Sequence, residues 1–201
     1  MAYVLGYFAA DGCMNKNRRG AHFIEFQTID KDSIEQLRST LNSAHKVSIR
    51  KYSPKHSKLY RLQIGSKDMY NDLITLGFTP AKSNVLEFPT MPVSMFPHFT
   101  RGYFDGDGHV SVCSYKRRGR NAGLSTTIIS GFTSGSKNFL VSLHNKLKRY
   151  AKISGGSLYF NKGYRLNFSV NDSKKLYEFI YGKNKILYLT RKREIFRNYF
   201  K

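Results

Sequence analysis

The stretch Val4-Leu5-Gly6-Tyr7-Phe8-Ala9-Ala10-Asp11-Gly12 recurs as Thr100-Arg101-Gly102-Tyr103-Phe104-Asp105-Gly106-Asp107-Gly108. Both copies are short, largely apolar segments that end in an acidic residue followed by glycine. Each copy also has two small residues four positions apart, Gly6/Ala10 and Gly102/Gly106. Small residues at that spacing share one face of a helix, where a second backbone can approach closely. The repeat therefore predicts two helices that pack against each other.

The ends of these two helices indicate a metal site. Packing of the helices is expected to bring the carboxylates of Asp11 and Asp107 together. Two carboxylates at one point repel each other unless a cation lies between them or one is protonated. A single copy of the motif would more simply be a helix followed by a turn. The second copy favours a divalent metal ion as the explanation.

The charge of the chain indicates a polyanionic partner. The sequence has 34 Lys and Arg against 13 Asp and Glu, a formal net charge of +21. So large an excess opposes compaction and is typical of nucleic-acid binding. No apolar run is long enough to span a bilayer, and no targeting segment precedes the first motif. Cys13 and Cys113 lie outside any CxxC or Cys/His cluster, so neither a zinc site nor a disulfide is expected. We therefore expect an intracellular protein without a membrane partner.

The rest of the chain repeats in the same order. The first half predicts a strand over 22–28, a helix over 31–42, a hairpin from 47–52 and 59–65, and a helix over 67–76. The second half predicts strands over 110–115 and 125–132, a helix over 137–150, a hairpin from 157–160 and 164–170, and helices near 173–181 and 190–199. Matching residues are 96 positions apart at Asp11 and Asp107 but 106 apart at Phe26 and Phe132. This difference places roughly ten extra residues in a basic turn at 114–123. The expected domains are an N-terminal half at 1–87, an extended proline-rich linker at 88–97 and a C-terminal half at 98–201.

The paired motifs, their spacing and the αββαββα order resemble the LAGLIDADG homing endonucleases, in the single-chain form with two motifs. The resemblance implies an α+β fold of two pseudo-symmetric halves. The motif helices would form the interface, and two antiparallel sheets would form a saddle over the DNA major groove, in a monomer. It also implies that Asp11 and Asp107 bind metal, with the backbone carbonyls of Ala10 and Gly106 as supporting ligands. The first acidic position of the motif is Asp105 in the second copy but Ala9 in the first. We therefore expect the halves to differ in local polarity or packing there.

The resemblance implies further residues near the reacting phosphates. A lysine late in each half would offset charge in the transition state, and Lys82 and Lys192 occupy those positions. Asp30, with Ser136 as its counterpart, would order water in the active site. Asp30 also fits the N-cap of the following helix, which is the preferred role of its side chain, and the two roles are compatible. His22 and His109 flank the motif regions and are expected to be local polar or packing residues rather than catalytic bases.

The implied function is site-specific cleavage of double-stranded DNA at a long asymmetric target, leaving 3′ overhangs, in intron homing. Mg²⁺ held by carboxylate and carbonyl oxygens can activate water and stabilise the leaving oxygen. Mn²⁺ is expected to substitute, and Ca²⁺ to bind without supporting cleavage. The alternative is a nucleic-acid binder without cleavage on the same fold, either an intron-RNA maturase or a DNA-binding regulator. Retention of both aspartates favours the nuclease, and a nucleic-acid packaging protein would need neither.

Basic residues on strands and hairpin tips are the expected DNA contacts, and Lys16, Arg18 and Arg19 are expected in a turn directly after the first motif. Arg can read guanine edges with two hydrogen bonds, and Lys mostly binds phosphates. The candidates are Lys16, Arg18, Arg19, Arg50, Lys51, Lys58, Arg61, Lys116, Arg117, Arg118, Arg120, Lys162 and Arg165.

Overall fold

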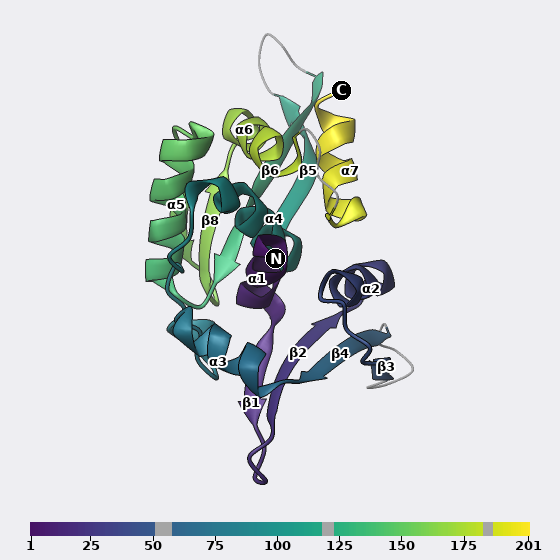
Figure 1. Ribbon diagram of the computed structural model, residues 1–201. Coiled ribbons are helices and arrows are strands. Elements are labelled where there is room, and N and C mark those ends of the chain that lie inside the picture. Colours follow the sequence, from purple (N-terminus) through teal and green to yellow (C-terminus); the bar gives the residue numbers. More distant parts are fainter. Residues whose placement is uncertain (51–57, 118–122, 183–186) are drawn as a thin grey trace. The chain divides into compact units, whose positions relative to one another are not determined.

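The computed structural model describes residues 1–50, 58–117, 123–182 and 187–201 (Figure 1). The chain divides into two compact units, Met1–Gly106 and Asp107–Lys201. Each unit contains a four-stranded sheet whose paired strands are antiparallel. The predicted α+β class with two repeated sheets is confirmed.

The first unit begins with the first motif helix and contains most of the second. Its elements are α1 (Ala2–Asp11), β1 (Cys13–Lys16), β2 (His22–Thr28), α2 (Lys31–Thr40), β3 (Val47–Arg50), β4 (Leu59–Gly65), α3 (Lys67–Thr75), 3₁₀ turns at Lys82–Asn84 and Val93–Met95, and α4 (Phe96–Asp107). The strand order is β1-β2-β4-β3. Ile24, Phe26 and Leu62 point to one face of this sheet and are fully buried. Because side chains alternate along a strand, the residues between them point to the opposite face.

The motif helices α1 and α4 approach each other through their glycines. A Cβ atom on Gly6 would lie 2.0 Å from the carbonyl oxygen of Phe99, and a Cβ on Gly102 would lie 2.0 Å from that of Tyr3. Any side chain at either position would therefore push the backbones apart. The predicted packing of the two small-residue stripes is confirmed.

The second unit repeats the order of elements with a longer first hairpin. It consists of β5 (Gly108–Arg117), β6 (Gly123–Ser134), α5 (Lys137–Ala151), β7 (Ser157–Phe160), β8 (Tyr164–Phe168), α6 (Val170–Tyr181) and α7 (Thr190–Tyr199). The strand order is β5-β6-β8-β7. Leu140, Leu143 and Leu147 of α5 are fully buried, as their helical spacing predicts.

The hairpin of β5 and β6 corrects one prediction. Pairing runs from Gly108 opposite Phe132 to Arg117 opposite Gly123, whereas β8 pairs with β6 only over Ser130–Ser134. Beyond that point the two strands form a ribbon with no third strand among the described residues (Figure 1). The segment 114–123 was predicted to be a turn that begins at the end of the strand over 110–115, but the strand continues to Arg117 and the next one already begins at Gly123. Residues 118–122 lie outside the described residues.

Two other segments differ from prediction. Lys16 was expected in a turn but ends β1, and Arg18 and Arg19 do form the turn. The linker was expected to be extended throughout, yet Val93–Met95 forms a 3₁₀ turn and Phe96 already begins α4. None of the helices in the described ranges is long and apolar enough to cross a membrane.

Candidate metal and nucleic-acid site

The two motif aspartates occupy the ends of their helices. Asp11 is the last residue of α1 and is exposed, and Asp107 is the last residue of α4 and is partly exposed. Neither helix has a basic residue in its last turn. A carboxylate there adds to the negative end of the helix dipole, so each end favours a cation. A Cβ on Gly106 would lie 3.2 Å from Oδ2 of Asp11. The Asp11 carboxylate therefore lies beside Gly106 of α4, the residue that precedes Asp107.

A buried lysine lies directly behind each motif. Lys82 Nζ donates a hydrogen bond of 2.6 Å to the carbonyl oxygen of Gly12, which follows Asp11. Lys192 Nζ makes the same 2.6 Å bond to Gly108, which follows Asp107. Their side chains are only 6% and 5% exposed. Burial of an ammonium group is energetically costly unless the group has strong hydrogen-bond partners. The same buried lysine contact in both units is therefore a specific feature of the repeat and not a chance surface contact.

The backbone before Lys82 is held in an unusual conformation. Ala81 has φ 58° and ψ 34°, in the left-handed region that residues with a side chain rarely adopt. The turn Lys82–Asn84 follows immediately. Strained backbone of this kind persists only where surrounding packing enforces it, and it is common at functional sites.

Asp30 takes the predicted N-cap position of α2, but its side chain makes no capping hydrogen bond. Its counterpart Ser136 does cap α5, because its Oγ accepts from the Phe139 N–H at 3.3 Å. The preference for capping as the role of the Asp30 side chain is therefore wrong.

The negative charges of three carboxylates act on the buried side chain of Tyr7. Burial raises the pKa of Tyr7, and although a hydrogen bond with Thr28 lowers it, the negative charges of Asp11, Asp105 and Asp30 raise it further. Asp30 therefore acts on the same buried side chain as Asp11. The role of Asp30 in ordering water stays a prediction.

A buried polar cluster explains the difference between the two motifs. Tyr3 Oη donates a 2.8 Å hydrogen bond to Asp105 Oδ2. The Arg101 guanidinium lies 5.3 Å from the centre of the Tyr3 ring. All three residues are at most 4% exposed.

The symmetry-related positions, 96 residues away, have no such groups. Phe99 corresponds to Tyr3, Leu5 to Arg101 and Ala9 to Asp105. The hydrogen-bond donor, the cation and the acceptor are therefore all replaced by apolar residues at these positions. Because the three groups are present together or absent together, no polar group of this set is buried without its partners. The expected difference in polarity between the halves is confirmed.

The face of the first sheet opposite Ile24, Phe26 and Leu62 is its open face, and the corresponding face of the second sheet is named in the same way. A charged pair lies at the centre of the open face of the first sheet. Glu25 is 5% exposed and accepts hydrogen bonds from Arg61 and Gln27. Burial raises the pKa of Glu25, but the bonds from Arg61 and Gln27 lower it by more, so the pKa of this carboxyl lies below its ordinary value. Arg50 is on the same face and adds to this effect. The paired carboxylate fixes the direction of the Arg61 guanidinium.

The second sheet differs at the equivalent positions. Arg165 occupies the register position of Arg61, but Gly131 replaces Glu25. His109 fills this space and hydrogen-bonds with Asn167, while burial lowers its pKa. These contacts agree with the expectation that His109 is a packing residue. The open faces of the two sheets therefore carry different side chains at equivalent positions of the same strand arrangement.

The predicted DNA contacts fall into three groups. By strand alternation Arg50, Arg61, Arg117 and Arg165 point to the open faces, whereas Lys16 and Lys116 point to the opposite faces. Arg18, Arg19, Lys58 and Lys162 are exposed in turns or at strand ends. Lys51, Arg118 and Arg120 lie outside the described residues.

Sequence reasoning missed the Glu25–Arg61 pair and the Tyr3–Asp105 bond. The members of these pairs are 36 and 102 residues apart. Only the unusual presence of an acid in a strand of a basic chain could have drawn attention to Glu25. Among the described residues no group of three or more His, Cys, Asp and Glu side chains forms a metal cage.

Comparisons with known proteins give one matching family model and several similar folds. Residues 1–74 match the family model of the LAGLIDADG-like domain. The fold is similar to that of the I-LtrWI LAGLIDADG homing endonuclease bound to target DNA, with TM-score 0.64, 12% identity and coverage of 99% of this chain and 88% of that one. The homing endonuclease I-WcaI bound to its DNA recognition sequence gives TM-score 0.64, 14% identity and coverage of 97% and 84%. The LAGLIDADG meganuclease I-AabMI bound to uncleaved DNA gives TM-score 0.61 and 15% identity, with coverage of 98% of this chain and 88% of that one. A search of curated protein sequences found no match.

Proposed function

We propose that this chain, which carries a LAGLIDADG-like domain at its start and has the fold of the single-chain LAGLIDADG homing endonucleases, cleaves double-stranded DNA at a specific site. The observation that carries the proposal is the repeated lysine contact behind each aspartate, Lys82 to Gly12 and Lys192 to Gly108. A purely structural pair of helices would need no ammonium group at both motif ends. The DNA in the similar structures supports duplex DNA as the substrate.

The donor groups at the helix ends fit Mg²⁺. Asp11 and Asp107 would hold the ion, with the carbonyl oxygens of Ala10 and Gly106 as further ligands, since Mg²⁺ prefers a few protein oxygens and retains water. When bound, Mg²⁺ lowers the pKa of a coordinated water and neutralises charge on the phosphate. Mn²⁺ would replace it in cleavage, and Ca²⁺ would support binding only.

The chain's own residues would supply position and charge. Lys82 and Lys192 place fixed positive charge behind the two motif ends, where negative charge develops on the phosphate in the transition state. Asp30 would orient water near Asp11. The open sheet faces would select the sequence, and because they carry different groups the target would be asymmetric. Products with short 3′ overhangs and a role in intron homing complete the proposal.

Selection of cleavable sites from a randomised duplex library with Mg²⁺ tests the activity and supplies a substrate. On that substrate, Asp11→Asn and Asp107→Asn should each abolish cleavage of both strands while binding measured in Ca²⁺ is retained. Asp68→Asn, at an exposed position of α3, is the matched control and should cut normally. Normal cleavage by both motif variants would overturn the metal assignment.

A different outcome would favour the alternative function. If the wild-type chain selects a tight duplex or RNA ligand but cuts neither with Mg²⁺ or Mn²⁺, the protein is a maturase or a regulator on this fold. The buried lysines would then serve only to neutralise the helix ends.

A further inference from the structure

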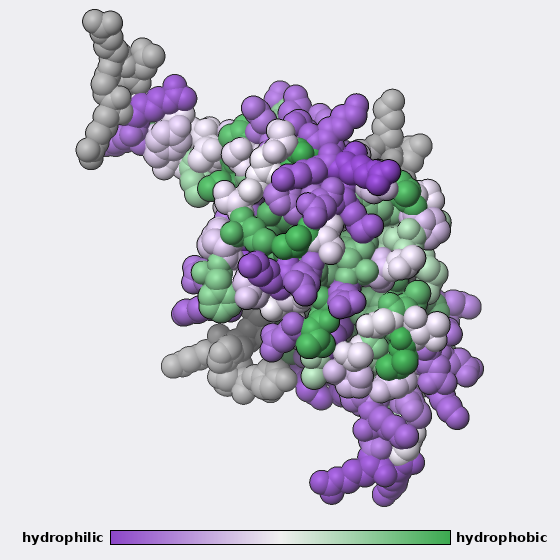
Figure 2. Space-filling model, turned by 90° about the vertical axis from the view of Figure 1, so that its left-hand side faces the viewer, coloured by the Kyte–Doolittle hydropathy of each residue, from purple (hydrophilic) through white to green (hydrophobic). Residues whose placement is uncertain are grey.

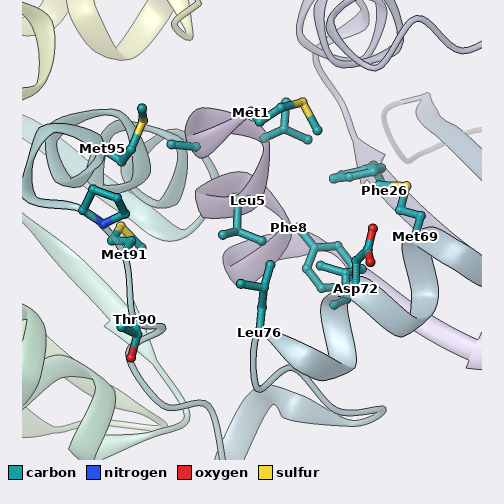
Figure 3. Close-up of a pocket in the computed structure, with 14 residues that line it drawn as sticks. Met1, Leu5, Phe8, Phe26, Met69, Asp72, Leu76, Thr90, Met91 and Met95 are labelled. Carbon is teal, nitrogen blue, oxygen red and sulfur yellow. The ribbon is translucent and has the colours of Figure 1, made fainter.

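An apolar pocket opens within the first unit on the helical side of its sheet. It has a volume of about 400 Å³ and lies between α1, α3 and the segment 90–95. Figure 3 shows Met91 and Met95 on one side of Leu5 of α1, Asp72 and Met69 of α3 on the other, and Leu76, which follows α3, below Leu5. This methionine pocket is defined by Leu5, Met69, Leu76, Met91 and Met95. Its volume is within the range of about 300–1,000 Å³ typical of binding pockets.

Methionine is concentrated here to an unusual degree. Four of the chain's five methionines, Met1, Met69, Met91 and Met95, line the pocket. Methionine is unbranched and polarizable, so it adapts to varied apolar shapes and is frequent at surfaces that bind peptides. Leu76 and Met95 are 41% and 44% exposed. Figure 2, which faces the side where α3 lies in Figure 1, shows apolar patches reaching the surface among hydrophilic side chains.

The charge around the methionine pocket is opposite to that of the chain. A neighbouring polar cleft shares Leu76 and Thr90 with it. None of the described residues lining the pocket or the cleft is Lys or Arg. The charged groups are the carboxylates of Asp72 and Glu87 and the α-amino group of Met1, so the acidic groups are in excess. Asp68 precedes Asp72 by one helical turn. The ion pairs found within the described ranges involve none of these three acids. An apolar, locally acidic surface disfavours nucleic acid and anionic lipid and favours a basic ligand.

The pocket is separate from the candidate DNA face. Phe26 lines the pocket and points away from the face that carries Glu25 and Arg61, because adjacent residues of a strand alternate. An occupant of the pocket would therefore leave the open face of this sheet accessible.

We propose that the methionine pocket docks a basic amphipathic helix of a partner protein. Large apolar side chains at positions i, i+3, i+4 and i+7 of such a helix would fill the pocket, and its flanking Lys or Arg residues would pair with Asp72 and Glu87. This interaction goes beyond the proposed cleavage of DNA and does not depend on it.

Methionine-methyl NMR of the full chain tests the proposal. The probe is a helical peptide of about 18 residues, or five turns, with Leu on one face and Lys on the other. It should shift the methyl signals of Met69, Met91 and Met95 and leave that of Met14, which lies in β1, in place. The same shifts should occur with a DNA duplex bound. A peptide of the same composition with scrambled order is the first control.

Variants locate the binding surface. Asp72→Lys and Leu76→Lys should each weaken binding of the Leu–Lys peptide by roughly five- to tenfold, through lost attraction and lost apolar contact. Ile74→Lys is the matched control, since Ile74 is 44% exposed on the same helix but does not line the pocket. Unmoved methyl signals, equal binding of the scrambled peptide, or equal weakening by all three variants would overturn the proposal. Shifts that depend on protein concentration without peptide would assign the surface to a second copy instead.

Discussion

At the residue scale, Ala81 holds a strained conformation immediately before a candidate catalytic lysine. Its φ of 58° costs a residue with a side chain about 1–2 kcal/mol. Ala81→Gly should therefore raise the free energy of unfolding by about 1 kcal/mol, after the greater freedom of glycine in the unfolded chain is allowed for. Urea denaturation of the two proteins measures this difference.

Lys152→Gly provides the comparison for Ala81→Gly. Lys152 ends α5 with φ 55° and ψ 29° and is exposed, so the same gain of about 1 kcal/mol is expected there. If only Lys152→Gly stabilises the protein, the conformation of Ala81 is not strained.

Glu25 makes stability depend on pH in a predictable direction. Its folded pKa is below the ordinary value of 4.5, so its contribution is complete above that value and is lost as the pH falls through the folded pKa. At pH 7, Glu25→Gln should lower the free energy of unfolding by about 1–3 kcal/mol, because Arg61 loses a buried charged partner. The difference from wild type should shrink as the pH falls through the folded pKa of Glu25.

Glu35→Gln is the control for this pH experiment. Glu35 pairs with Arg38 in the exposed part of α2, where an ion pair contributes about 0–1 kcal/mol. Its effect should be small at every pH. A Glu25→Gln difference that stays constant from pH 7 to acid would contradict the assigned role of the carboxylate.

At the element scale, the packing of α1 on α4 contains one buried polar bond that its symmetric position lacks. Tyr3→Phe removes the donor to Asp105 and should cost about 1–3 kcal/mol, since Asp105 is 2% exposed and cannot turn to water. In an Asp105→Ala background the same change should cost much less, because the acceptor is gone. The resulting pair resembles Phe99 and Ala9 of the symmetric position. Thermal or urea unfolding of the four proteins gives the coupling energy. Equal costs in both backgrounds would show that the bond does not stabilise the helix pair.

The sequence predicted most elements because their apolar patterns are long enough to recognise. The strand over 22–28 and the helix over 190–199 were predicted with their observed bounds. β1 was missed because it has four residues, of which only Met14 is buried. The outer ends of the β5–β6 ribbon, Lys116, Arg117, Gly123 and Leu124, were missed because they are all exposed and only Leu124 is a large apolar residue, so no alternation of apolar and polar residues appears.

The candidate site was predictable only where the repeat specified it. Lys82 and Lys192 were found because each lies at a matching place in its half, and the structure gives both the same hydrogen bond. Glu25 and Arg61 have no such marker, because their pairing exists only after two strands meet. The methionine pocket likewise joins a helix, a linker and the chain start, which no local pattern connects.

At the scale of the whole molecule, the net charge of +21 raises the question of whether DNA affinity comes from total charge or from particular faces. A binding surface that tracks phosphates releases counterions, so the logarithm of the binding constant falls with that of salt, with a slope of about −0.9 per phosphate contact. If the open sheet faces are that surface, the slope depends on where a charge is removed.

Arg50→Gln and Lys67→Gln separate these explanations, because each removes one exposed positive charge from the first unit. Arg50 shares the open face with Arg61, whereas Lys67 begins α3 on the helical side. Arg50→Gln should make the salt slope shallower by about one unit, and Lys67→Gln should leave it unchanged. Fluorescence anisotropy with a labelled duplex at several salt concentrations measures both slopes. Equal changes in the two variants would mean that the protein binds DNA through its overall charge, and the open face would then have no special part in binding.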